Sequence, residues 1–88
     1  MNRIPIRNEQ YVWRNLDGEG VLLNPETGKY FGVNTVGCSF WEQVDGEKSM
    51  AEIATLLLEE YEVDRQTLES DLTSLVETMV EKGLISFR

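Results

Sequence analysis

Short apolar runs separated by turn-forming residues occupy the first third of the chain, a pattern typical of β-strands. Aromatic and β-branched side chains are concentrated in three runs, at residues 11–14, 20–24 and 29–33. Asp17 and Gly18 mark a turn in the first gap. In the second gap Pro25 presets φ and Gly28 is free to adopt a positive φ. The pattern predicts a three-stranded antiparallel meander whose third strand leaves one side as an open edge.

From Asn34 onward the apolar positions recur at helical spacing, and capping residues divide this part into separate helices. Asn34 suits the N-cap of a first helix, which ends at Asp45–Gly46. Ser49 and Glu52 match a capping box, in which each side chain bonds the other residue's backbone N–H. They open a second predicted helix that runs to about Tyr61.

The third predicted helix begins after Asp64 and ends at Gly83, where a left-handed glycine stops the helix and Leu84 supplies the hydrophobic contact that follows. One face of this helix is apolar, and its members are Leu68, Leu72, Leu75, Val76 and Met79. Residues 84–87 are expected to return as a short strand. The predicted fold class is α+β, a three-stranded meander followed by three helices that cover one face of the sheet.

The chain is expected to form a single domain, because its 88 residues provide room for one modest hydrophobic core. We expect this domain to span residues 10–88, after a flexible arm at residues 1–9 in which Arg3 to Arg7 fray. Cys38 is the one cysteine, so an intrachain disulfide is excluded, which favours a reducing, cytoplasmic setting. No window approaches the ~20 consecutive apolar residues of a membrane-spanning helix.

Charge and histidine content narrow the function. The sequence has 16 acidic and 8 basic residues and a net charge of -8, which repels nucleic-acid phosphates and anionic lipid. It contains no histidine, so the commonest general base and the commonest transition-metal ligand are missing. We therefore expect a binding protein that is not an enzyme and that needs no metal or cofactor.

Three other candidate functions have simpler explanations or face opposing charge. Cys38 lies early in a predicted helix with no histidine to accept its proton, which favours a packed thiol over a nucleophile. Ser70 invites comparison with the modified serine of acyl carrier proteins, but it lies inside a predicted helix and precedes Asp71. A DNA-binding winged helix is the alternative interpretation. However, five acids against two bases along the third helix would oppose phosphate contact.

The open edge of the third strand is the remaining candidate site. An edge strand binds an extended peptide through main-chain hydrogen bonds, flanking pockets select alternate side chains, and no catalytic residue is needed. Gly32 would let a guest backbone approach closely. The alternative interpretation is that Gly32 only marks a bulge and that Tyr30 and Phe31 fill core and surface positions.

Several stretches together resemble the PqqD family, and they lie at residues 21–24, 28–34, 45–46, 49–53 and 81–85. Tyr30–Phe31 before Val33–Asn34 is most similar to the free-standing members of lasso-peptide pathways. Members of this family bind the leader segment of a ribosomally made precursor peptide so that a partner enzyme can process the rest. The resemblance implies a winged-helix-like fold in which the leader lies antiparallel along the third strand and against the third helix.

Carried over residue by residue, the resemblance assigns peptide binding to ten positions. They are Lys29, Tyr30, Phe31, Gly32 and Val33 on the strand, and Asp71, Leu72, Leu75, Val76 and Met79 on the helix. Because most of the helix residues also belong to the expected core, the groove would use the edges of the apolar stripe, with Asp71 and Val76 as opposite candidates. The implied partners are a precursor leader peptide and a processing enzyme such as a leader peptidase, a cyclase or a radical enzyme. The predicted function is a leader-peptide chaperone, with tyrosine, proline or leucine anchors expected in the guest.

Overall fold

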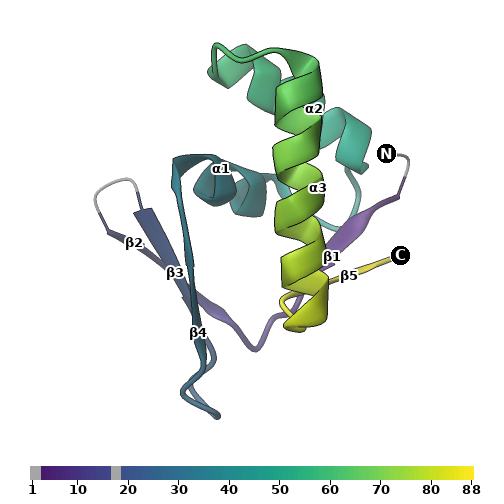
Figure 1. The fold of residues 1–88 in the computed structure, drawn as a ribbon. Coiled ribbons are helices and arrows are strands. Elements are labelled where there is room, and N and C mark those ends of the chain that lie inside the picture. The colour runs from purple at the N-terminus through teal and green to yellow at the C-terminus, as the bar shows by residue number, and fades with distance from the viewer. Residues whose placement is uncertain (1–2, 17–18) are drawn as a thin grey trace.

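The computed structural model describes residues 3–16 and 19–88, and Figure 1 shows how they are arranged. The elements in chain order are β1 (Pro5–Arg7), β2 (Val12–Leu16), β3 (Glu19–Leu23), β4 (Tyr30–Val33), α1 (Thr35–Gln43), α2 (Met50–Glu60), α3 (Arg65–Glu81) and β5 (Ile85–Phe87). The α+β class, the antiparallel meander and its three following helices are confirmed. The turn predicted at Asp17 and Gly18 lies outside the described residues.

The meander has the strand order β2-β3-β4, so β4 lies at an edge of the sheet. Alternation along the strands gives the sheet two distinct faces. Leu22 and Val33 are buried on the inner face, whereas Tyr30 and Gly32 lie on the outer face and are exposed. The turn into β4 uses the predicted glycine, since Gly28 has a φ of 73°.

Helix α1 packs on the inner face of the meander, against β3 and β4. Its N-cap is Asn34, whose Oδ1 accepts a hydrogen bond from the Gly37 N–H at 2.9 Å. Gly37 lets the helix approach the strand closely, because a Cβ atom added there would lie 2.9 Å from the Cβ of Val33. The core beneath consists of Leu22, Val33, Cys38, Phe40, Trp41, Val44, Met50, Ile53, Ala54, Leu57, Leu68, Leu72, Val76, Met79, Leu84 and Ile85.

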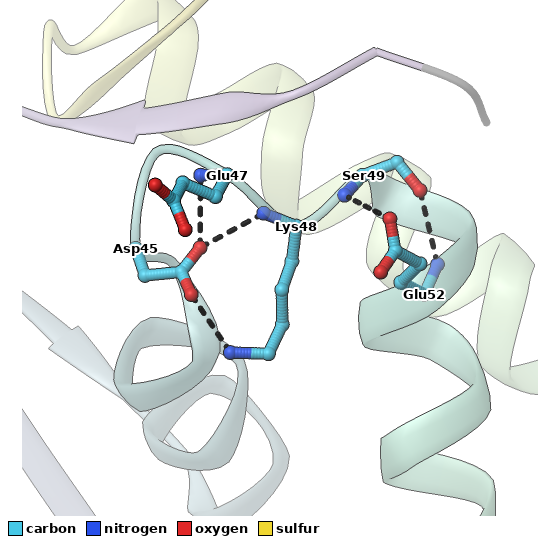
Figure 2. A network of polar contacts seen from close by, with 5 residues as sticks. All are labelled: Asp45, Glu47, Lys48, Ser49 and Glu52. Atoms are coloured by element: carbon cyan, nitrogen blue, oxygen red, sulfur yellow. Dashed lines mark hydrogen bonds and ion pairs between the residues drawn. The ribbon is translucent and has the colours of Figure 1, made fainter.

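A polar loop joins α1 to α2 (Figure 2). The Asp45 carboxylate accepts hydrogen bonds from the Lys48 ammonium group at 2.8 Å and from the backbone N–H groups of Lys48 and Glu47. These bonds, the Lys48 side chain first, hold the pKa of Asp45 well below its ordinary value. The predicted capping box is confirmed, because Ser49 Oγ accepts from the Glu52 N–H and Glu52 Oε1 accepts from the Ser49 N–H.

The carboxyl end of α3 also follows the sequence prediction. Gly83 has a φ of 77°. Its N–H donates to the Val80 carbonyl at 3.1 Å, and the Leu84 N–H donates to the Met79 carbonyl at 2.8 Å. This is the glycine-based stop that leaves few helix carbonyls unpaired. Leu84 then begins the turn into β5 as a fully buried side chain.

The structure differs from the sequence prediction at the amino-terminal segment, where Arg3 to Arg7 were expected to fray. Residues 5–7 form β1, which pairs antiparallel with β5 in a second, two-stranded sheet. The guanidinium carbon of Arg3 lies 4.1 Å from the centre of the Phe87 ring, and the Arg3 carbonyl accepts from the Met50 N–H at 2.8 Å. The segment is ordered because its partner strand, about eighty residues further along the chain, supplies the hydrogen bonds.

Candidate functional site

The free edge of β4 presents a defined set of backbone groups. Asn24 and Lys29 form a hydrogen-bonded pair at the start of the ladder, with the Asn24 N–H donating to the Lys29 carbonyl at 2.8 Å. Hydrogen-bonded and non-hydrogen-bonded pairs alternate along an antiparallel ladder. Phe31, paired with Leu22, therefore bonds to β3, and Tyr30 and Gly32 direct their N–H and C=O groups away from β3. In the described part of the chain no strand pairs with this side of β4, so the predicted open edge is confirmed.

Gly32 leaves open space beside this edge. A Cβ atom added there would have no other atom within 4 Å. Its φ lies outside the left-handed region, so the conformation of Gly32 is one that other residues can adopt. The β3–β4 register also continues without an unpaired residue across Gly32, which argues against a bulge at this position.

Two hollows lie between α3 and the meander side of the molecule. The larger one, the hairpin hollow, has a volume of about 580 Å³ and lies between the beginning of β4 and the end of α3. The smaller one, the α1–α3 hollow, has a volume of about 310 Å³ and lies beyond the end of β4. The hairpin hollow is lined by Tyr11, Gly28, Lys29, Tyr30, Phe31, Glu81, Lys82 and Leu84. The α1–α3 hollow is lined by Asn34, Val36, Gly37, Asp71, Leu72, Ser74 and Leu75.

The strand residues assigned from sequence lie at different depths. Lys29, Tyr30 and Phe31 line the hairpin hollow, with Tyr30 exposed to 74% and Phe31 half-buried against the core. Val33 is buried under α1 and contributes to the core. Gly32 faces solvent at the edge.

The helix residues assigned from sequence divide between the hollow and the core. Asp71, Leu72 and Leu75 line the α1–α3 hollow together. Val76 and Met79 are buried in the core, and Met79 is fully so. Of the two opposite edges of the apolar stripe, the structure thus brings the Asp71 edge to the hollow.

Several residues beside β4 were not assigned to peptide binding from sequence. Tyr11, Lys82 and Leu84 line the hairpin hollow, and Asn34 and Val36 line the α1–α3 hollow. Lys82 could have been identified from sequence, because it lies eleven positions after Asp71 and positions eleven apart lie on one face of an α-helix. Tyr11 carried no such signal, since only the tertiary fold brings it to β4.

Two other kinds of candidate site are a reactive cysteine and a metal site. Cys38 is a buried thiol in α1, where burial and then the negative charge of Glu42 raise its pKa. A raised pKa leaves less of the reactive thiolate, as expected for a packed cysteine. Residues 3–16 and 19–88 contain no cluster of three or more histidine, cysteine, aspartate or glutamate side chains that could hold a metal ion. None of the helices described is both long enough and apolar enough to cross a membrane.

Comparison with known proteins adds a family and three solved structures. The sequence model of PqqD, described as coenzyme PQQ synthesis protein D, matches residues 19–85. TbiB1 in complex with the TbiA(beta) leader peptide has a TM-score of 0.79 and 34% sequence identity, covering 92% of this chain and 94% of that one. Lasso peptide synthetase B1 complexed with the leader peptide has a TM-score of 0.78 and 27% identity, covering 93% and 96%.

The third structure is much larger than this chain. It is the heterocyclase TruD, with a TM-score of 0.68 and 14% identity, and the match covers 98% of this chain and 12% of that one. At this level of identity the likeness shows the fold alone. A search of curated protein sequences returned no match.

Proposed function

The chain belongs to the PqqD family, and from this premise we propose that it is a non-catalytic recognition protein for the leader segment of a ribosomally made precursor peptide. The leader binds by adding a strand to β4. The chain then presents the bound peptide to a modifying enzyme or peptidase. The proposed compartment is the cytoplasm, where ribosomal precursors are made and where the thiol of Cys38, the one cysteine of the chain, stays reduced.

The observation that carries this proposal is the open edge of β4. Tyr30 and Gly32 each direct one donor and one acceptor outward, so a paired peptide would gain four main-chain hydrogen bonds. At about 1 kcal/mol each these contribute about 4 kcal/mol, whereas micromolar binding requires about 8 kcal/mol. The remaining binding free energy of about 4 kcal/mol corresponds to about 160 Å² of buried apolar surface, before the free-energy cost of association is counted. Apolar anchor side chains in the guest are therefore required.

The two hollows are the proposed sites for these anchors. A strand alternates its side chains, so every second guest residue would point from the β4 edge toward α3. In the α1–α3 hollow the proposed contacts are Asp71, Leu72 and Leu75, and in the hairpin hollow Lys29, Tyr30 and Phe31. Val76 and Met79 would support the groove from the core and would not touch the guest.

The neighbouring structures support a peptide ligand of this kind. TbiB1 and lasso peptide synthetase B1 are each seen with a leader peptide, and each matches this chain over nearly its whole length. We infer that a lasso-peptide leader is the ligand class to test first.

The decisive experiment compares two substitutions at Gly32. Synthetic leader segments of precursor peptides encoded beside this chain are titrated by fluorescence anisotropy against the wild type, Gly32→Pro and Gly32→Ala. Proline removes the outward N–H, and its ring occupies the space that the guest backbone needs. Because Gly32 does not bond to β3, this substitution leaves the β3–β4 ladder intact. Alanine keeps the N–H and meets no atom within 4 Å.

We expect micromolar or tighter binding by the wild type, affinity within about threefold for Gly32→Ala, and a loss of about tenfold or more for a folded Gly32→Pro, the equivalent of roughly one hydrogen bond. Circular dichroism and thermal unfolding establish that both variants fold. Failure of the wild type to bind any neighbouring leader would refute the function. Wild-type affinity in folded Gly32→Pro would refute its location at β4.

A further inference from the structure

The outer face of the meander is an apolar surface that the fold leaves uncovered. The row nearest the β3–β4 turn consists of Val12, Leu23 and Tyr30, which lie directly opposite one another on β2, β3 and β4. Val12 is exposed to 42% and Tyr30 to 74%, two of the largest exposures of apolar side chains in the described residues. Helix α1 packs against β3 and β4 on the inner face, and Figure 1 shows the helices on one side of this sheet.

We propose that this outer face docks the enzyme that processes the bound peptide. The inference rests on the proposed function and adds a location for the second partner. Tyr30 and Gly32 belong both to the face and to the open edge. A leader paired with β4 would therefore extend the same sheet, and its alternate side chains would project on the same side as Val12 and Tyr30. An enzyme seated there would touch the chain and the peptide at once.

Charge distinguishes this face from the rest of the surface. The chain carries a net charge of -8. On the outer face the charged residues of β2 and β3 are Arg14 and Glu19, whose charges cancel. The exposed faces of α2 and α3 carry an excess of acidic residues, whereas the outer face of the meander does not. An apolar surface on a partner can therefore approach the meander without facing an excess of negative charge. The occupant we expect therefore has an apolar contact patch with few charges at its centre.

The size of the face argues against a second copy of this chain as the occupant. Three strands of four residues cover a footprint of about 200 Å², from strand spacings of about 4.8 Å and a rise of about 3.4 Å. A stable interface buries about 800 Å² per partner. The face alone supplies about a quarter of this area, too little for a stable dimer through this face. A docked enzyme must therefore bury further surface, and the peptide strand added at β4 supplies part of it. The enzyme should consequently bind the peptide-loaded chain more tightly than the free chain.

The test uses two matched substitutions of exposed valines. Val12→Glu places a charge in the row of Val12, Leu23 and Tyr30, and Val63→Glu places the same charge at a valine exposed to 38% in the loop between α2 and α3. Arg14→Glu is a second variant on the same face, at a position that is already polar and exposed. For each protein we would measure the affinity for the leader, and the affinity for the leader peptidase encoded beside the chain, with and without saturating leader.

We expect all three variants to bind the leader with an affinity within about twofold of the wild type. The affinity of the leader-loaded chain for the peptidase should fall about tenfold or more in Val12→Glu and in Arg14→Glu, but not in Val63→Glu. Leader should also strengthen peptidase binding to the wild type.

Unchanged peptidase affinity in folded Val12→Glu and Arg14→Glu, with leader binding intact, would overturn the docking surface and leave the recognition function standing. A wild-type dimer in solution that Val12→Glu dissociates would assign the face to a second copy instead. Absence of leader binding by the wild type would overturn both proposals.

Discussion

Gly20 and Gly32 provide a paired test of how the meander is packed, because they lie on opposite faces of the same sheet. A Cβ atom at Gly20 would lie 2.0 and 2.1 Å from two ring atoms of Trp13, and 2.9 Å from the Cys38 sulfur. A Cβ atom at Gly32 would meet nothing within 4 Å. Trp13 therefore lies over the bare backbone of Gly20 and closes the inner face of the sheet at that point.

The expected effects have opposite signs. Overpacking of this kind costs about 1–3 kcal/mol, and Gly20→Ala must move the Trp13 ring to remove the overlap. Gly32→Ala should instead stabilise the fold by about 0.4–1 kcal/mol, because alanine reduces the conformational entropy of the unfolded chain. In a domain of this size each kcal/mol corresponds to about 4–8 °C in Tm, so the two variants should differ by at least about 6 °C.

The assay combines thermal unfolding with tryptophan fluorescence. Trp41 is exposed to only 2%, so a red shift in the emission of Gly20→Ala would report movement of Trp13. A Trp13→Phe background supplies the control, since phenylalanine lacks the ring atoms that overlap, and the cost of Gly20→Ala should shrink there. Equal stability of Gly20→Ala and Gly32→Ala, or an undiminished cost in the Trp13→Phe background, would refute this account of the packing.

Two further predictions concern the helices. Ser49→Ala removes the acceptor that pairs with the Glu52 N–H and should lower the free energy of unfolding by about 1 kcal/mol, measured by urea denaturation with an unchanged m value. A cost below a few tenths of a kcal/mol would show that the cap is dispensable. The raised pKa of Cys38 predicts a stabilising contribution that is complete below the pKa of the unfolded thiol, about 8.5, and is lost as the pH rises through the higher folded value. Stability should thus fall more between pH 7 and pH 10 in the wild type than in Cys38→Ala, and equal losses would contradict the assignment.

The features that the sequence predicted are those with local signals. The capping box at Ser49 and Glu52, the N-cap at Asn34 and the stop at Gly83 each involve residues within five positions of one another. The meander likewise followed from turn chemistry at Gly28 and from runs of strand-forming side chains. In each case a short stretch contains both partners of the interaction, so a single pattern identifies them.

The features that sequence did not predict depend on distant contacts. β1 has three residues and no partner nearby in the chain, so its pairing with β5 left no recognisable pattern. The apolar stripe of α3 showed which residues turn inward but not which flank faces β4. The fold places Val76 in the core and Asp71 beside the α1–α3 hollow. The assignment of individual peptide contacts stays a prediction until a complex is measured.

The pairing of β1 with β5 also determines how this unit can be joined to other polypeptides. Pro5 lies opposite Phe87 in the antiparallel ladder, so the chain enters and leaves the fold at neighbouring points. Any segment fused before β1 or after β5 would start from the same corner of the molecule, whereas β4 belongs to the other sheet. Such a unit can be inserted into a loop of a larger protein with little disturbance of either partner, because adjacent ends need only a short gap in the host.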